Sequence, residues 1–315
     1  MWRHSTAMPV SSLLAESVGC DALITSTTDP VDSDLLDAAA TVRAISQVAV
    51  GVDNIDVAEC TSRGVPVGHT PDVLTETTAD TAWALLAASV RRIPEGHALV
   101  ASGEWAGWRP DLLLGGDLHG CTLGIVGLGR IGAAVARRAA GFEMRLVYAG
   151  PRRKPHLEAE LRVSHRSLHD LLAETDAVVV TVPLGPGTTH LLGPAELATM
   201  QPHSVLVNVA RGPVVDTDAL VEALADGRPG WAALDVTDPE PLPAGHPLVS
   251  APNCLITPHI GSASHRTRRR MSQRAIANVV AFAAGRPMPW CVNPDVYLGD
   301  SAPGRLDREH DPAAE

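Results

Sequence analysis

The second half of the chain carries three polar motifs whose side chains are of the types that transfer protons and bind anions. The motifs are NVARG with Arg211, DVTDPEP with Glu240, and TPHIGS with His259. An imidazole can donate a proton near neutral pH, a carboxylate can orient it, and a guanidinium can bind a carboxylate through two parallel hydrogen bonds. A single histidine among 13 is more often structural than catalytic. The elements around these residues must therefore decide whether they act together.

The elements predicted around the motifs place them at one edge of a parallel sheet. Each motif follows a short apolar run that is typical of a strand, at 204–209, 232–235 and 254–257. The carboxyl ends of parallel strands lie at the same edge, where open α/β sheets bind ligands. We therefore expect the three motifs to face one site.

Short apolar, β-branched runs alternate with helical patterns along the whole chain, which is typical of parallel α/β sheets. A long helix is predicted at 77–100, and a Gly-, Trp- and Pro-rich segment at 102–116 connects two α/β series. The polar tail from Ser301 is expected to be disordered. Besides the strands named above, we expect strands at 22–25, 42–50, 65–68, 122–126, 144–149 and 176–182.

The run Gly127-Leu128-Gly129-Arg130-Ile131-Gly132 matches the fingerprint of dinucleotide-binding turns. A predicted strand precedes it and a predicted helix follows it, which is the context that the fingerprint requires. Gly127 permits the tight turn, Gly129 lets the backbone approach a pyrophosphate, and Gly132 lets the helix pack against its strand. We expect a dinucleotide site at this turn, including Arg130 and Ile131. The alternative is a purely structural glycine-rich turn.

The loop after the second strand of this unit indicates which dinucleotide binds. NAD sites usually place an acidic residue there, but this chain has Gly150, Arg152 and Arg153, and no acid before Glu158. Arginines can bind a 2′-phosphate, which a carboxylate would repel. The sequence favours NADPH, with NADH as a second possibility. The alternative interpretation is a solvated basic loop.

Composition excludes several other classes of protein. The 315 residues include 25 basic and 36 acidic side chains, a net charge of −11, which does not favour nucleic acid or an anionic membrane. No apolar stretch approaches the roughly 18 residues that span a bilayer, and residues 1–10 contain no secretory signal. The five scattered cysteines predict neither disulfides nor a metal site. We expect a cytoplasmic protein with reduced cysteines.

In combination, NVARG, LDVTDPEPLP and TPHIGSASHRTR resemble the D-isomer-specific 2-hydroxyacid dehydrogenase family. VGVDNID, HTPDVLTETTAD, YAGPRR and EPLPAGHPL look most like its glyoxylate/hydroxypyruvate reductases. The resemblance implies reduction of a small 2-keto acid to the D-2-hydroxy acid by a homodimer. It also implies two Rossmann-like or flavodoxin-like domains, with the cofactor domain (94–285) inserted in a substrate domain (1–93 and 286–315).

Carried onto matching positions, the resemblance assigns a role to each motif. His259 is the expected proton donor, Glu240 orients it, and Arg211 binds the substrate. The substrate would also contact Val50 and Gly51 through their backbone, together with Ser262. The remaining positions expected to contact the cofactor are Pro183, Val209, Asp235 and Gly261.

One departure from the family pattern concerns the N-terminus. By comparison, the chain is expected to begin near the second strand of the substrate domain, and a full α/β half would carry roughly 25 to 30 residues more, one strand and one helix. In a flavodoxin-like order the lost strand would leave a gap inside the sheet, with unpaired backbone on both neighbours. We expect such a form to be poorly stable or weakly active.

Two other functions are compatible with the same motifs. One is an NAD-dependent D-2-hydroxyacid or phosphoglycerate-type dehydrogenase, which differs mainly in the loop with Arg152 and Arg153. The other is a nucleotide-sensing co-regulator that keeps the fold without turnover, since fold alone does not establish activity.

Overall fold

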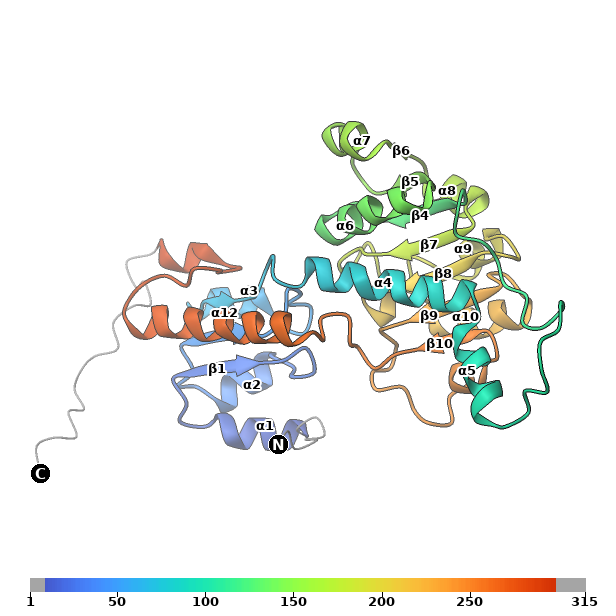
Figure 1. Ribbon diagram of the computed structural model, residues 1–315. Helices are drawn as coiled ribbons and strands as arrows, with labels where there is room; N and C mark the ends of the chain where they lie inside the picture. The colour runs from blue at the N-terminus through green and yellow to red at the C-terminus, as the bar shows by residue number, and fades with distance from the viewer. Residues whose placement is uncertain (1–8, 299–315) are drawn as a thin grey trace, which may run out of the picture. The chain divides into compact units, whose positions relative to one another are not determined.

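The computed structural model describes residues 9–298, which form two compact units (Figure 1). The first unit combines the residues before Thr75 with those from Ser264 onward, and the second is Thr75–Ala263. Residues 1–8 and the tail from Ser301 lie outside the described part. Within residues 9–298, every helix is too short or too polar to span a lipid bilayer. All five cysteines are free thiols.

The first unit is built on a three-stranded parallel sheet in the order β1–β2–β3. β2 (Ala44–Gln47) is the central strand and is buried along its whole length. It lies between β1 (Ala22–Thr25) and β3 (Val67–Gly68), and α12 (His265–Ala283) packs against β1 and β2. The other helices are α1 (Val10–Ser17), α2 (Ser33–Ala38), α3 (Val57–Ser62) and the 3₁₀ helix η3 (Pro294–Tyr297).

The prediction of a gap inside this sheet was wrong. β1 and β2 are direct parallel neighbours, from Ala22 opposite Ala44 to Thr25 opposite Gln47. In the predicted order, the missing strand would have separated the strand at 22–25 from the next strand. In the structure these two strands pair along their whole length. Among the described strands, β1 therefore forms one edge of the sheet, and its Ile24 side chain is half exposed.

The second unit contains a seven-stranded parallel sheet in the order β10–β9–β8–β7–β4–β5–β6. The chain enters at β4, adds β5 and β6 on one side, and then returns to add β7 to β10 on the other. The two directions diverge between β4 and β7, the kind of switch point at which doubly wound sheets bind ligands. Both sheets are parallel, which confirms the predicted α/β class. The strands are β4 (Thr122–Val126), β5 (Arg145–Ala149), β6 (Val163–His165), β7 (Ala177–Val180), β8 (Val205–Asn208), β9 (Trp231–Leu234) and β10 (Cys254–Ile256).

Apolar side chains cover both faces of this sheet. On β7, Ala177 and Val179 join one buried cluster and Val178 and Val180 join the other, because successive residues of a strand point to opposite faces. The helices of the unit are α4 (Thr75–Val90), α5 (Ile93–Ala101), α6 (Arg130–Ala139), α7 (Pro155–Leu161), α8 (Leu168–Glu174), α9 (Pro194–Thr199), α10 (Thr217–Ala225) and α11 (Pro247–Ser250), with 3₁₀ helices η1 (Ala140–Phe142) and η2 (Gly212–Val214).

The single helix predicted at 77–100 is instead two helices, α4 and α5. Arg92 has a left-handed backbone conformation, with φ of 52°, which ends the helical path. Pro94 then lies in the first turn of α5, where its missing N–H leaves no hydrogen bond unmade.

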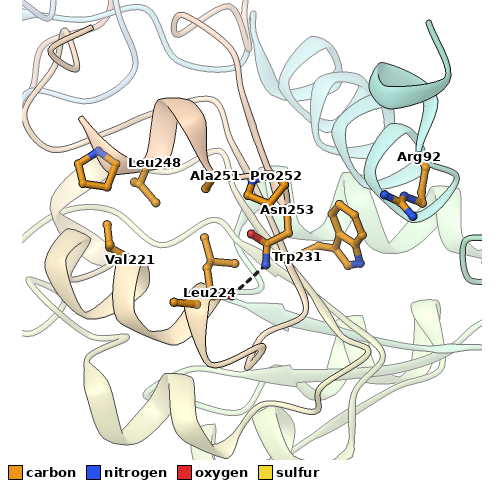
Figure 2. A pocket seen from close by; sticks show the side chains of 10 residues that line it. Arg92, Val221, Leu224, Trp231, Leu248, Ala251, Pro252 and Asn253 are labelled. Carbon is orange, nitrogen blue, oxygen red and sulfur yellow. Dashed lines mark hydrogen bonds between the residues drawn. The ribbon is translucent and has the colours of Figure 1, made fainter. Parts of the chain in front are cut away.

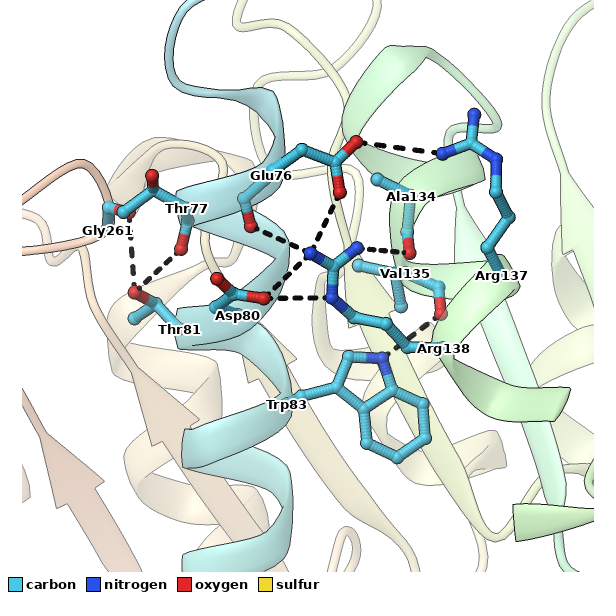
Figure 3. A network of polar contacts seen from close by, with 10 residues as sticks. All are labelled: Glu76, Thr77, Asp80, Thr81, Trp83, Ala134, Val135, Arg137, Arg138 and Gly261. Carbon is cyan, nitrogen blue, oxygen red and sulfur yellow. Dashed lines mark hydrogen bonds and ion pairs between the residues drawn. The ribbon is translucent and has the colours of Figure 1, made fainter. Parts of the chain in front are cut away.

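The boundaries between the units, at Thr75 and Ser264, lie earlier than the predicted 94 and 285. The reason is that α4 packs on the second unit and α12 packs on the first. Polar contacts hold α4 to α6 (Figure 3): the Arg138 guanidinium donates to Asp80 at 2.7 and 2.9 Å, and Trp83 Nε1 donates to the Val135 carbonyl at 3.0 Å. α12 packs instead on the sheet of the first unit. α4 therefore belongs to the second unit and α12 to the first.

Candidate active site

Three neighbouring strands of the second unit end at the polar motifs. Arg211 follows β8, Asp235 follows β9, and the segment with His259 follows β10. β8, β9 and β10 are adjacent and parallel, so their carboxyl ends lie at one edge of the sheet. The order of the strands therefore brings the three motifs to the same edge.

His259 and Glu240 form a hydrogen-bonded pair, with 2.6 Å between Nδ1 and Oε1. A carboxylate oxygen only accepts, so the proton of this contact is on Nδ1, and Nε2 is left to face a ligand. The two side chains are 29% and 32% exposed, so they are shielded but reachable. His259 itself has a left-handed backbone, with φ of 53°.

The charge state of Glu240 follows from its neighbours. Burial raises the pKa of its carboxyl, but the hydrogen bond from His259 and the positive charges of His259 and Arg211 outweigh that effect. The net result is a pKa of Glu240 below its usual value. Glu240 is therefore an anion near neutral pH, and Arg211 lies close enough to contribute to this.

Arg211 is fixed by the turn that contains it. Asn208 Nδ2 donates to the Arg211 carbonyl at 2.9 Å, and the Arg211 guanidinium donates to the Ala210 carbonyl at 2.8 Å. Gly212 packs so tightly that a Cβ there would lie 1.9 Å from the Thr237 carbonyl oxygen. The chain after β8 is thus pressed against the segment that leads to Glu240.

Asp235 has a structural task that the sequence did not predict. Its side chain is 2% exposed, and its carboxylate accepts hydrogen bonds from Thr257 Oγ1 (2.6 Å), Ile260 N (2.8 Å) and Gly261 N (2.6 Å). These bonds fix the loop that carries His259 at residues before and after it in sequence. The acid at the end of β9 therefore positions the loop after β10.

The glycine-rich turn after β4 has the shape that a dinucleotide needs. Gly127 has φ of 98°, and a Cβ there would lie 2.7 Å from the Val182 side chain, so only glycine fits. Gly132 lies against the Gly127 carbonyl, which brings α6 close to β4. Gly129 caps α6 without offering a side chain to its amides, and a Cβ there would meet nothing within 4 Å. The turn therefore leaves open space at the positive end of a helix dipole.

Two contacts of this turn were missed by sequence reasoning. Thr181, after β7, donates through Oγ1 to the Gly127 carbonyl at 2.6 Å. Lys154 Nζ donates to the Leu128 carbonyl at 2.7 Å. Both side chains hold carbonyls of the turn in place, and only the fold reveals this because both partners are distant in sequence.

The structure distinguishes the two arginines of the loop after β5. Arg153 forms a two-pronged ion pair with Glu158, and Tyr148 donates to the same carboxylate at 2.8 Å. The hydrogen bonds from Arg153 and Tyr148 lower the pKa of Glu158 to about 2, so the pair is fully charged at neutral pH. Arg152 is exposed, and no residue of the described part forms a hydrogen bond or ion pair with it.

A separate pocket of about 540 Å³ lies at the amino ends of β9 and β10 (Figure 2). The Arg92 guanidinium covers the Trp231 ring there, 4.9 Å from its centre. The other residues that line this pocket are mostly apolar: Val221, Leu224, Ala225, Pro247, Leu248, Ala251, Pro252 and Asn253. It lies at the opposite edge from His259 and is not the candidate active site.

Comparison with known proteins agrees with this geometry. The sequence profile of the D-isomer specific 2-hydroxyacid dehydrogenase NAD binding domain matches residues 83–261, more than half of the chain. The chain belongs to this family. The dehydrogenase is therefore an NAD(P)-dependent oxidoreductase, and the sheet with the glycine-rich turn is its NAD binding domain.

Relatives of this dehydrogenase are similar over almost their whole length. A glyoxylate reductase of Korarchaeum cryptofilum is 47% identical over 298 residues, 94% of this chain and 90% of that protein. The crystal structure of a protein from Thermus thermophilus is 48% identical, with a TM-score of 0.86 and 91% of each chain covered. The NADPH-dependent glyoxylate/hydroxypyruvate reductase of Sinorhizobium meliloti, solved with NADP and malonate, is 33% identical, with a TM-score of 0.81 over 92% of this chain and 87% of that one.

Proposed function

We propose that this dehydrogenase reduces glyoxylate, hydroxypyruvate or another small 2-oxo acid, with NADPH as the preferred reductant. The observation that carries the proposal is the His259–Glu240 pair beside Arg211, at the sheet edge that also carries the glycine-rich turn. The names of the relatives support the substrate class, since several of them are glyoxylate reductases.

The proposed roles follow from the chemistry of each group. His259 donates a proton from Nε2 to the carbonyl oxygen, and Glu240 keeps the imidazole oriented and charged. Arg211 binds the substrate carboxylate and polarises the ketone. The further positions proposed to contact the substrate are Val50 and Gly51, through their amides, and Ser262. The nicotinamide cofactor, when bound, supplies the hydride.

Residues of the second unit would hold the dinucleotide. Amides at the start of α6 (Arg130, Ile131) and the open space at Gly129 suit a pyrophosphate. The further positions proposed to contact the cofactor are Gly127, Gly132, Gly150, Pro183, Val209, Asp235 and Gly261.

The proposed function is tested by following the absorbance of NADPH and NADH against a panel of 2-oxo acids. We expect turnover with glyoxylate and hydroxypyruvate, and a higher kcat/KM with NADPH than with NADH. No turnover with any 2-oxo acid would reject the activity, whereas a clear preference for NADH would reject only the assignment of the cofactor.

The NADPH preference should depend more on Arg152 than on Arg153, because Glu158 already neutralises Arg153. For Arg152→Ala we expect the KM for NADPH to rise about 20-fold, as for loss of a charge-assisted hydrogen bond. The KM for NADH should stay within about twofold, because NADH lacks the 2′-phosphate.

Arg153→Ala is the matched control for this prediction. It removes the same charge from the same loop, but its main effect should be a lower Tm, since Glu158 loses its positively charged partner and keeps the hydrogen bond from Tyr148. Equal rises in the KM for NADPH in both variants would show that the two arginines share the phosphate.

We also propose that the enzyme is a homodimer. Five large apolar side chains are exposed on the segment that begins at α5, which is more than scattered surface residues would explain. They are Ile93, Val100, Trp105, Trp108 and Leu114. A monomeric mass in light scattering at micromolar concentration would reject this assembly.

A further inference from the structure

Two backbone amides of the first unit lie free at the end of β2. Val50 and Gly51 lie shortly after β2, which ends at Gln47, and within residues 9–298 neither of their N–H groups donates a hydrogen bond. Both residues are partly buried. N–H groups without a protein partner can bind water or a ligand, and two successive ones can together bind an anion.

Each of these N–H groups belongs to a peptide whose carbonyl is held by the segment after β3. The Val50 N–H shares its peptide with the Ala49 carbonyl, which accepts from Thr70 N at 2.8 Å. The Gly51 N–H shares its peptide with the Val50 carbonyl, which lies 3.0 Å from His69 Nδ1. A carbonyl oxygen only accepts, so His69 carries a proton on Nδ1 in this contact.

Holding the carbonyl of a peptide has two effects on its N–H group. The peptide is planar, so fixing the carbonyl fixes the direction in which the N–H points. A hydrogen bond to the carbonyl also polarises the peptide and makes its N–H a better donor. His69 therefore both aims and strengthens the Gly51 donor.

His69 is itself held in place by the C-terminal part of the chain. Its N–H donates to the Trp290 carbonyl at 3.0 Å, and its carbonyl accepts from Asn278 Nδ2 at 3.2 Å. Asn278 is fully buried and also accepts from Trp290 N at 3.1 Å. At Gly68, a Cβ would lie 2.5 Å from Asn278 Nδ2, so the backbone next to His69 is tightly packed. The backbone that carries the His69 imidazole is therefore held in place by hydrogen bonds and tight packing.

We propose that His69 is a positioning residue for the substrate carboxylate, acting through the Val50–Gly51 peptide. The inference rests on the proposed function, because it takes the anion at these amides to be the carboxylate of a 2-oxo acid. In this role the imidazole acts only through the peptide that it holds, so its loss should weaken substrate binding more than it slows the chemical step.

The test compares His69→Phe with His69→Asn, because the asparagine amide places an N–H donor near the position of Nδ1. For His69→Phe we expect the KM for the 2-oxo acid to rise about tenfold, as for loss of one hydrogen bond, with kcat and the KM for NADPH within about twofold. His69→Asn should restore most of the wild-type KM. His203→Phe is the control, since His203 also makes one side-chain hydrogen bond, to Asp176, but at the amino end of a strand.

A titration with oxalate by calorimetry tests the same inference without turnover. We expect oxalate to bind the wild type and His69→Asn, and to bind His69→Phe about tenfold more weakly. Equal oxalate affinity in all three proteins, or an asparagine variant as impaired as the phenylalanine variant at unchanged Tm, would overturn the role of His69. If the wild type reduces no 2-oxo acid, the proposed function fails, and the titration still decides whether His69 sets the anion affinity of this loop.

Discussion

Replacement of His259 by asparagine is expected to lower kcat for 2-oxo acid reduction by about 10² to 10⁴, the usual contribution of a general acid. The hydrogen bond of 2.6 Å to Glu240 leaves Nε2 as the nitrogen that can donate to substrate. Asparagine is suited to the test because it tolerates the left-handed backbone found at this position. The variant should therefore fold like the wild type while losing its proton donor. Steady-state kinetics at saturating NADPH measure the effect.

His190→Asn is the matched control for this substitution. His190 also has a positive φ, of 50°, and its imidazole lies 3.8 Å from the Asp216 carboxylate. It should keep wild-type turnover and a similar Tm. A His259→Asn variant that retains more than about a tenth of wild-type kcat would contradict the role of His259. A wild type that binds NADPH without any turnover would instead favour the nucleotide-sensing alternative.

Local patterns predicted the parallel class and the glycine-rich turn because both depend on short-range periodicity. The strand at 177–180 is apolar at every residue, and Gly127, Gly129 and Gly132 follow β4 without a gap. Partners that are distant in sequence could not be predicted this way. The hydrogen bond of Thr181 to Gly127 and that of His69 to Val50 depend on which strands become neighbours.

The sequence pattern also could not predict where the two units divide, or which arginine of the loop after β5 forms an ion pair. α4 has apolar positions that suit any sheet, and only its contacts with α6 assign it to the second unit. Arg152 and Arg153 are equivalent in sequence, yet the side-chain direction of Arg153 pairs it with Glu158. The prediction of a gap inside the first sheet was wrong for the same reason, because no single strand determines the order of the strands.

Glu240→Gln should lower kcat/KM for reduction about 100-fold at pH 8, and much less near pH 6. The pKa of the Glu240 carboxyl lies below its usual value, so its negative charge beside His259 persists through this pH range. Glutamine can still accept a hydrogen bond from Nδ1, but it lacks the negative charge that would stabilise a cationic proton donor. The pH above which reduction declines should therefore move down.

The pH dependence of the reverse reaction provides a second test of this prediction. Oxidation of the hydroxy acid needs a neutral imidazole to accept the proton, so the pH below which oxidation declines should also move down in Glu240→Gln. Glu240→Asp, which keeps the charge on a shorter side chain, should lose rate in both directions without moving either limit. If the two limits stay at their wild-type pH in Glu240→Gln while the rate falls, the carboxylate orients His259 without stabilising its charge. Paired pH profiles of kcat/KM in both directions therefore separate the electrostatic role of Glu240 from its positional one.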